Sequence, residues 1–331
     1  MSFQKTAYSL VFRVLCLLSA LSVSSCVAYH LVLEHSIDRS HPGGDGGSIL
    51  PQEDLKSELP QTPPKNEDGL TVISDTAAVQ NFLLIGTDAR TPGEACRSDA
   101  MILISLNRAS KKIVACSLLR DMLVTIDGHG RNRLNSAYSF GGVDLLLKTL
   151  KDQLNLDISS YVSVDFSSFS EIIDLLGGVD LSVSSEEAKV MNEMCAQQNS
   201  GVSKIPLKDG VYHLNGTQAL AYARNRSSAN GDFDRTQRQR NLIEALMKKL
   251  KNASALELLQ LLYVILPNVT TNISEENFKV LVSGLTEYLH YQRIFTSIPQ
   301  SGTFSFVTVR GMAVIDVDFP SNIRYLSEQI Y

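Results

Sequence analysis

The pattern of apolar and polar positions divides the chain into three parts. An apolar run covers residues 14–33, a polar stretch with several Pro and Gly residues covers 34–76, and short apolar runs alternate with amphipathic segments over 77–331. A helix of about 20 residues, at ~1.5 Å per residue, crosses the ~30 Å hydrocarbon core of a bilayer. The pattern therefore predicts a transmembrane helix, a flexible stalk and one folded domain.

The charges beside the apolar run predict its orientation. Lys5 and Arg13 precede the run, whereas acidic residues follow it. The positive-inside rule then makes residues 1–13 a cytoplasmic tail, and it places the folded domain outside the cell in a single-pass membrane protein. In an alternative interpretation, the tetrapeptide ending at Cys26 is a lipoprotein box and a lipid on Cys26 is the anchor.

Strand-like and helix-like segments alternate along residues 77–331. The apolar runs at 81–87, 100–106 and 112–119 are typical of strands that are buried on both faces. Further strands are expected at 161–165, 179–183, 307–310 and 312–317, and helices at 143–154, 169–176, 186–197, 214–224, 232–251, 256–266, 275–289 and 321–329. This order predicts an α/β (α+β mixed) fold with a central mixed β-sheet flanked by helices.

An arginine cluster stands out from a mildly acidic chain. The 331 residues carry a formal net charge of -5, yet five arginines and no lysine fall between Tyr222 and Arg240. Guanidinium groups bind phosphate oxygens two at a time, so the cluster predicts a phosphate site, with a solvated basic helix as the alternative. Arg235 and Gln239 share one helix face, Arg238 flanks it, and Arg240 is expected to point into solvent.

Charged residues also border three successive predicted strands. Asp88 follows the first strand, Arg97 and Asp99 precede the second, and Arg120-Asp121 ends the third. Two carboxylates such as Asp88 and Asp99 suit Mg²⁺, with Mn²⁺ as an alternative, and they leave positions for phosphate oxygens. Arginines stabilise the charge of a leaving phosphate, and a free carboxylate accepts the proton of an attacking hydroxyl. The pattern predicts phosphoryl transfer.

Several segments together resemble, in order, the motifs of the LytR-CpsA-Psr family. These segments are Asn81–Asp88, Cys96–Asp99, Ser117–Asp121, Arg133–Tyr138 with Gly141-Gly142, Leu175–Val179, Leu214–Arg226 and Asp232–Gln239. The resemblance is specific over about Val79–Leu250 and looser up to Tyr331. One departure is Leu119, where the family usually has Pro.

The resemblance implies a membrane-anchored transferase of the bacterial cell wall. Such enzymes move a glycopolymer, for example a teichoic acid or a capsule chain, from a polyprenyl-pyrophosphate carrier to peptidoglycan. The implied metal ligands are Asp88 and Asp99, and the implied catalytic residues are Asp99, Arg120 and Asp232. The implied pyrophosphate-binding residues are Arg97, Arg120, Arg224, Arg226, Arg235 and Gln239. The family holds the prenyl tail in an apolar tunnel, which 140–154 and 169–176 would line unless they are ordinary core.

The same residues are compatible with other functions to different degrees. A pyrophosphohydrolase would use the same acids and arginines with water as the acceptor, and a non-catalytic wall regulator would only bind. Control of DNA is disfavoured, because about thirteen cytoplasmic residues are too few for a helix-turn-helix, and an acidic chain disfavours nucleic acid.

The cysteines give one structural expectation. The chain has five cysteines and no Cys-x-x-Cys pair, so a zinc or redox site is not predicted. Cys116 lies in an apolar run and is expected to be a buried thiol. Cys96 and Cys195 lie in polar stretches, where an oxidising compartment permits a disulfide between them, and two separate thiols are the alternative.

Overall fold

The computed structural model describes residues 65–66, 69–88, 96–198, 200–226, 232–251, 265 and 268–331. The predicted transmembrane helix, the lipoprotein box, most of the stalk and most of the helix expected at 256–266 lie outside these residues. Within the described part of the chain, no helix is both long enough and apolar enough to cross a membrane.

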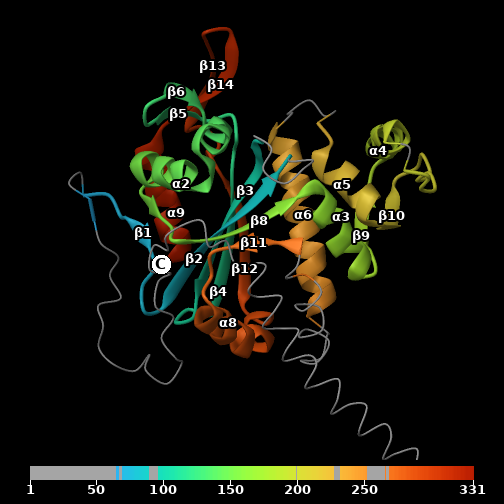
Figure 1. Ribbon diagram of the computed structural model, residues 1–331, viewed down its shortest axis with the longest axis horizontal. Coiled ribbons are helices and arrows are strands. Elements are labelled where there is room, and N and C mark those ends of the chain that lie inside the picture. Colours follow the sequence, from blue (N-terminus) through green and yellow to red (C-terminus); the bar gives the residue numbers. More distant parts are fainter. Residues whose placement is uncertain are drawn as a thin grey trace, which may run out of the picture.

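Six strands form the central sheet in the order β11-β8-β2-β3-β4-β12 (Figure 1). They are β2 (Val79–Thr87), β3 (Ser98–Asn107), β4 (Lys112–Leu118), β8 (Ser160–Asp165), β11 (Thr270–Thr271) and β12 (Gln292–Ile298). The strand β3 is antiparallel to both β2 and β4, whereas β8 is parallel to β2 and β12 is parallel to β4. The predicted mixed sheet is confirmed, although the sequence pattern did not predict β12.

The strand directions bring several loops to one edge of the sheet. Since β2, β4, β8 and β12 run the same way and β3 opposes them, the four C-terminal ends meet the N-terminal end of β3. Asp88 follows β2, Asp99 lies at the start of β3, and Arg120 follows β4. Residues from distant parts of the sequence therefore share one edge, which is the usual place for a ligand in such sheets.

The helices α2 (Leu134–Leu154) and α9 (Phe319–Ile330) cover one face of the sheet (Figure 1). They bury the main core, to which β2 contributes Leu83 and Ile85. The helix α2 begins earlier than predicted and is kinked at Gly141-Gly142, where Gly142 adopts a φ of 64°. Glycine takes this conformation without strain, so the predicted break becomes a kink inside one longer helix.

The other face carries α3 (Phe166–Leu175), α5 (Gly216–Arg224) and α6 (Asp232–Leu250) (Figure 1). Together with α4 (Ser185–Gln197) and the antiparallel pair β9 (Val179–Val183) and β10 (Gly210–Leu214), these helices bury a second core. A Cβ on Gly216 would lie 2.0 Å from the carbonyl oxygen of Ser170, so only glycine permits the close contact between α3 and α5. The helix α8 (Glu275–Tyr288) packs through a third, smaller cluster.

Two hairpins and one short pairing complete the domain. The hairpins are β5 (Leu123–Ile126)–β6 (Gly130–Arg133) and β13 (Phe304–Val309)–β14 (Met312–Val317), and the second projects from the top of the molecule in Figure 1. The strand β1 (Ile73–Ser74) pairs with β7 (Leu156–Asp157), and Ile73 is fully buried in the main core. The folded domain thus begins a few residues before the predicted boundary at 77, because this side chain belongs to the core.

Candidate active site

A β-bulge presents Asp99 at the edge of the sheet. Gly86 pairs with Ala100 and Thr87 pairs with Ser98, so Asp99 is the extra residue between them. Bulges of this kind redirect a side chain and are common beside active sites. The backbone N–H of Arg97 donates to the Asp88 Oδ1 atom at 2.7 Å, which fixes the second acidic residue on the neighbouring strand end.

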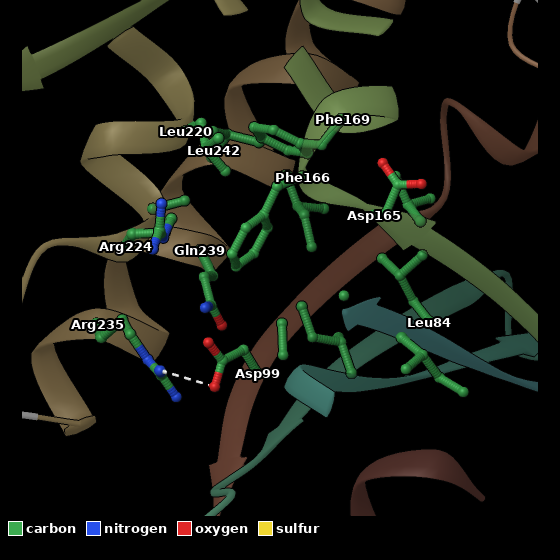
Figure 2. A pocket seen from close by; sticks show the side chains of 17 residues that line it. Leu84, Asp99, Asp165, Phe166, Phe169, Leu220, Arg224, Arg235, Gln239 and Leu242 are labelled. Atoms are coloured by element: carbon green, nitrogen blue, oxygen red, sulfur yellow. Dashed lines mark ion pairs between the residues drawn. The ribbon is translucent and has the colours of Figure 1, made fainter. Parts of the chain in front are cut away.

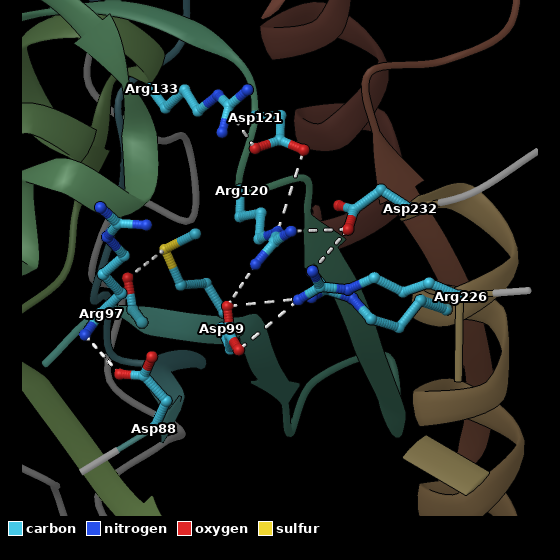
Figure 3. Close-up of polar contacts among 11 residues, drawn as sticks. Asp88, Arg97, Asp99, Arg120, Asp121, Arg133, Arg226 and Asp232 are labelled. Atoms are coloured by element: carbon cyan, nitrogen blue, oxygen red, sulfur yellow. Dashed lines mark hydrogen bonds and ion pairs between the residues drawn. The ribbon is translucent and has the colours of Figure 1, made fainter. Parts of the chain in front are cut away.

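Arg120 is the hub of an ion-pair network (Figure 3). Its Nη1 atom donates to the Asp99 Oδ1 atom, and its Nε atom lies 3.3 Å from Asp232 Oδ1 and 3.8 Å from Asp121 Oδ2. The loop that holds Arg120 is anchored by Leu119, a fully buried residue whose N–H donates to the carbonyl of Ile298 at 2.9 Å. Proline would lack this donor, so the departure from the family pattern adds a hydrogen bond between the loop and β12.

Two further arginines converge on the same carboxylates from the helical side (Figure 3). Arg235 is 2% exposed, and its guanidinium lies 2.7 Å from Asp232 Oδ1 and 3.8 Å from Asp99 Oδ1. Arg226 Nη2 lies 3.6 Å from Asp99 Oδ2. Asp99 is therefore in contact with three guanidinium groups that come from separate segments of the chain.

Burial and charge together shift the pKa values of this cluster. Burial lowers the pKa of Arg235 to about 10, and burial together with the charge of Arg120 lowers the pKa of Arg226. Burial also tends to lower the pKa of Arg120, but the carboxylates of Asp232, Asp99 and Asp121 outweigh it, and the pKa is raised. Burial raises the pKa of Asp232 even though Arg235 and Arg120 oppose this change. All these arginines remain charged at neutral pH.

The cluster carries a surplus of positive charge. Four guanidinium groups, from Arg120, Arg133, Arg226 and Arg235, lie within ion-pair distance of three carboxylates, from Asp99, Asp121 and Asp232. The side chain of Arg226 is 46% exposed, so an anion from solution can reach the surplus charge and compensate it. The arrangement favours an anionic ligand with several oxygens, such as a phosphate or a pyrophosphate.

An apolar cavity of about 140 Å³ adjoins the charged cluster (Figure 2). Its apolar wall includes Leu84, Phe166, Phe169, Leu220 and Leu242, and its polar residues include Asp99, Arg224, Arg235 and Gln239. The guanidinium of Arg224 lies 4.4 Å from the centroid of the Phe166 ring, which is cation–π distance. The cavity and the cluster together suit an amphipathic anion.

Most of the predicted site residues meet at this place. Asp99, Arg120, Arg226, Asp232 and Arg235 form the ion-pair network, whereas Arg224 and Gln239 line the cavity. The predicted shared face of Arg235 and Gln239 is thus confirmed. Arg97 is exposed and approaches the site through its backbone. Arg133 also belongs to the network, since its Nε atom lies 3.4 Å from Asp121. The sequence predicted no role for this residue, because the contact joins two separate segments and no local pattern indicates it.

Two expectations about the arginine helix and the tunnel are corrected by the structure. Arg240 is 9% exposed rather than solvated, because it turns toward β12 and donates to the Gln237 side chain at 2.6 Å and to the Thr296 carbonyl at 3.5 Å. The segment 140–154 belongs to α2, whose buried side chains lie in the main core on the opposite face of the sheet. Phe169 does line the cavity, so the second predicted segment contributes to it.

The predicted disulfide is also not formed. Cys96 and Cys195 are both present as thiols in the structure. Cys195 is buried within the second core, at the end of α4, and Cys96 lies beside the sheet edge. Cys195 lies on the buried face of the amphipathic helix α4, although most residues around it in the sequence are polar. Cys116 is a fully buried thiol, as predicted.

The fold and the site define a class of mixed α/β protein that has a buried arginine–carboxylate cluster beside an apolar cavity. Residues 52–314 match the LytR_cpsA_psr family, and the chain belongs to this family. It is 35% identical over 180 residues to the polyisoprenyl-teichoic acid–peptidoglycan teichoic acid transferase TagT of Bacillus subtilis (strain 168), a match that covers 53% of this chain and 54% of TagT. It is 33% identical over 209 residues to the regulatory protein MsrR of Staphylococcus aureus (strain COL), covering 62% and 59% of the two chains.

Solved structures agree with the fold. TagT bound to LIIa-WTA superposes with a TM-score of 0.60 at 27% identity, covering 76% of this chain and 91% of TagT. TagV of Bacillus subtilis superposes with a TM-score of 0.61 at 28% identity, covering 77% and 98%. The sequence matches to the curated relatives TagT and MsrR span less than two thirds of the length of those proteins.

Proposed function

We propose that this protein transfers a glycopolymer, such as a teichoic acid or a capsule chain, from a polyprenyl-pyrophosphate carrier to peptidoglycan. The observation that carries the proposal is that the ion-pair network and the apolar cavity share residues. Asp99 and Arg235 belong both to the ion-pair network and to the wall of the apolar cavity. A ligand at this junction would place an apolar tail in the cavity and a pyrophosphate among the arginines. The similarity to TagT, whose name describes this transfer, supports the same conclusion.

The chemistry follows from the charges around the pyrophosphate. An acceptor hydroxyl oxygen forms a bond to the polymer-bearing phosphorus, the bridging P–O bond breaks, and prenyl monophosphate leaves. Arg120, Arg226 and Arg235 would stabilise the negative charge that develops on the phosphate oxygens. The Oδ2 atom of Asp232 is buried and has no hydrogen-bond partner among the described residues. Because burial raises the pKa of this carboxyl, Asp232 suits the role of the base that takes the hydroxyl proton.

A magnesium ion fits the donor set as part of this proposal. Asp88 and Asp99 offer carboxylate oxygens at adjacent strand ends. Within the described ranges, no third His, Cys, Asp or Glu residue joins them in a group that could hold a metal ion. Two carboxylates leave most octahedral positions to water and phosphate oxygens. Asp88 and Asp99 would therefore hold Mg²⁺, or Mn²⁺, together with the substrate, and the ion would neutralise pyrophosphate charge.

The anchoring of the domain remains part of the same proposal. We propose that residues 14–33 cross the cell membrane with residues 1–13 in the cytoplasm, and that the domain works outside the cell. A polyprenyl carrier is itself a membrane lipid, so an anchor holds the site close to its donor. Attachment through a lipid on Cys26 would have the same consequence.

The test uses the full chain in detergent micelles with a prenyl-pyrophosphate-linked oligosaccharide donor and purified peptidoglycan. Transfer predicts that polymer becomes covalently bound to the wall fraction and that prenyl monophosphate is released in equal amount. Free polymer with prenyl monophosphate would instead identify a pyrophosphohydrolase. Donor binding without any release of prenyl monophosphate would identify a non-catalytic protein, in line with the name of MsrR.

A further inference from the structure

A second hollow lies on the other side of the charged cluster from the apolar cavity. This groove has a volume of about 690 Å³, within the ~300–1,000 Å³ range of small-ligand sites. Its wall includes Asp121 and Asp232, the end of β12 and the hairpin β13–β14. Figure 3 shows Asp121 and Asp232 on one side of Arg120 and Asp99 on the other. The groove shares no lining residue with the apolar cavity.

Three aromatic rings form one side of the groove. Phe304 and Phe306 project from the same face of β13, and their ring centroids lie 5.0 Å and 6.4 Å from the ring of Phe233 on α6. Phe306 is 73% exposed, the largest exposed fraction among the large apolar side chains of the described residues. With the half-buried rings of Phe233 and Phe304 it forms an apolar patch at a groove, a combination that is typical of ligand-binding sites. Phe233 directly follows Asp232, so the aromatic surface begins beside a carboxylate of the network.

The hairpin β13–β14 is attached to the loop that holds Arg120 and Asp121. The N–H of Ile315 donates to the carbonyl of Asp121 at 3.0 Å, and Met122 forms a parallel bridge with Ile315. Arg133, which also pairs with Asp121, donates to the carbonyl of Ala313 at 2.8 Å. The aromatic surface is therefore held at a fixed position relative to the Arg120–Asp121 loop.

The lining of the groove indicates the chemistry of its ligand. Ser297, Gln300 and Ser301 supply polar groups, and no lysine or arginine is among the described residues that line it. A pyranose ring has an apolar face of C–H groups, which stacks on aromatic rings, and a rim of hydroxyls, which form hydrogen bonds. We infer that the groove beside Phe306 binds a sugar ring of the glycan acceptor and delivers its hydroxyl to the charged cluster.

The position of the groove selects the acceptor over the donor, an argument that rests on the proposed function. In phosphoryl transfer the attacking and leaving oxygens lie roughly in line on opposite sides of phosphorus. A donor with its prenyl tail in the apolar cavity would have its leaving phosphate on that side. The attacking hydroxyl would then approach from the side of Asp121 and Asp232, where the groove lies.

The experiment compares Phe306→Ala and Phe306→Trp with Phe140→Ala in the full chain in detergent micelles. Phe140 is a matched control, since it is 44% exposed and stacks on His129 away from the residues that line either hollow. The binding probe is the β-1,4-linked tetramer of N-acetylglucosamine, measured by saturation-transfer NMR and calorimetry. Phe306→Ala is expected to raise its Kd by about 3- to 10-fold, the usual contribution of one aromatic stack, whereas Phe306→Trp restores binding. Thermal unfolding checks that each variant is folded.

Transfer kinetics supply the second measurement. Phe306→Ala should raise the KM for peptidoglycan and leave the KM for the prenyl-pyrophosphate donor unchanged. A rise confined to the donor KM would show that the groove holds the donor polymer and would overturn the inference. If the wild-type chain cleaves the donor but does not bind the tetramer, the sugar-site inference is overturned and the proposed function stands. Tetramer binding that depends on Phe306, in a chain that never cleaves the donor, would uphold the sugar site and refute the proposed function.

Discussion

Replacing Arg120 by lysine keeps the positive charge at the centre of the ion-pair network but removes the geometry of the guanidinium group. Arg120 presents different nitrogen atoms to Asp99 and Asp232, through Nη1 and Nε. A lysine at this position retains one positive charge but has only one nitrogen atom to offer. All its N–H donors start from that one atom, so it cannot place separate nitrogens against Asp99 and Asp232 as the guanidinium does.

The size of the effect follows from the contact that is lost. A charge-assisted hydrogen bond contributes about 1.5–3 kcal/mol, and the side chain of Arg120 is only 14% exposed, so solvent screening reduces this value little. If the contact acts on the transition state, Arg120→Lys should lower kcat/KM by about 10- to 150-fold. Because the charge is kept, the thermal unfolding midpoint should change little.

The assay measures prenyl monophosphate release and wall-linked polymer at varied donor concentration. The matched control is Arg324→Lys, since Arg324 is exposed on α9 and donates a hydrogen bond to the Ser321 hydroxyl at 3.3 Å. The control should retain wild-type kcat/KM. Equal losses in both variants, or wild-type activity in Arg120→Lys, would show that the bidentate geometry of Arg120 is irrelevant to catalysis.

The remaining predictions concern Arg224, Arg240, Asp232 and the metal site. Arg224→Lys should lower activity in the transfer assay, because an ammonium loses the planar stack on Phe166, while circular dichroism should show an intact fold. Arg240→Lys should lower the free energy of unfolding by about 1–3 kcal/mol in urea titrations, since one ammonium does not reproduce both hydrogen bonds of the buried Arg240 side chain; an unchanged midpoint would contradict its burial. The raised pKa of Asp232 predicts an acid limb in the kcat/KM profile, displaced upward from 3.8, that disappears in Asp232→Asn. Folding stability should fall as pH rises through that raised pKa, and less so in Asp232→Asn. Calorimetry should show Mg²⁺ binding only with a prenyl pyrophosphate present, and the double variant Asp88→Ala, Asp99→Ala should abolish it.

The sequence by itself determined which residues end the central strands. The apolar runs before Asp88 and Arg120 are too short for helices, so these charged residues are expected at the ends of strands. The i, i+4 spacing placed Arg235 and Gln239 on one helix face, and the structure keeps them there. These features are local, so the chain carries them without reference to distant contacts.

Only the tertiary structure decided what each face meets. Leu83 and Leu84 are both apolar, yet Leu83 packs into the main core and Leu84 lines the cavity, because helices from distant segments cover the two faces differently. Arg240 is buried because α6 lies against β12, a strand that the sequence pattern did not predict. The aromatic groove likewise exists only because β14 hydrogen-bonds to the Arg120–Asp121 loop across almost two hundred residues of sequence. Such long-range packing depends on the sum of many contacts, and hydrophobic periodicity does not record it.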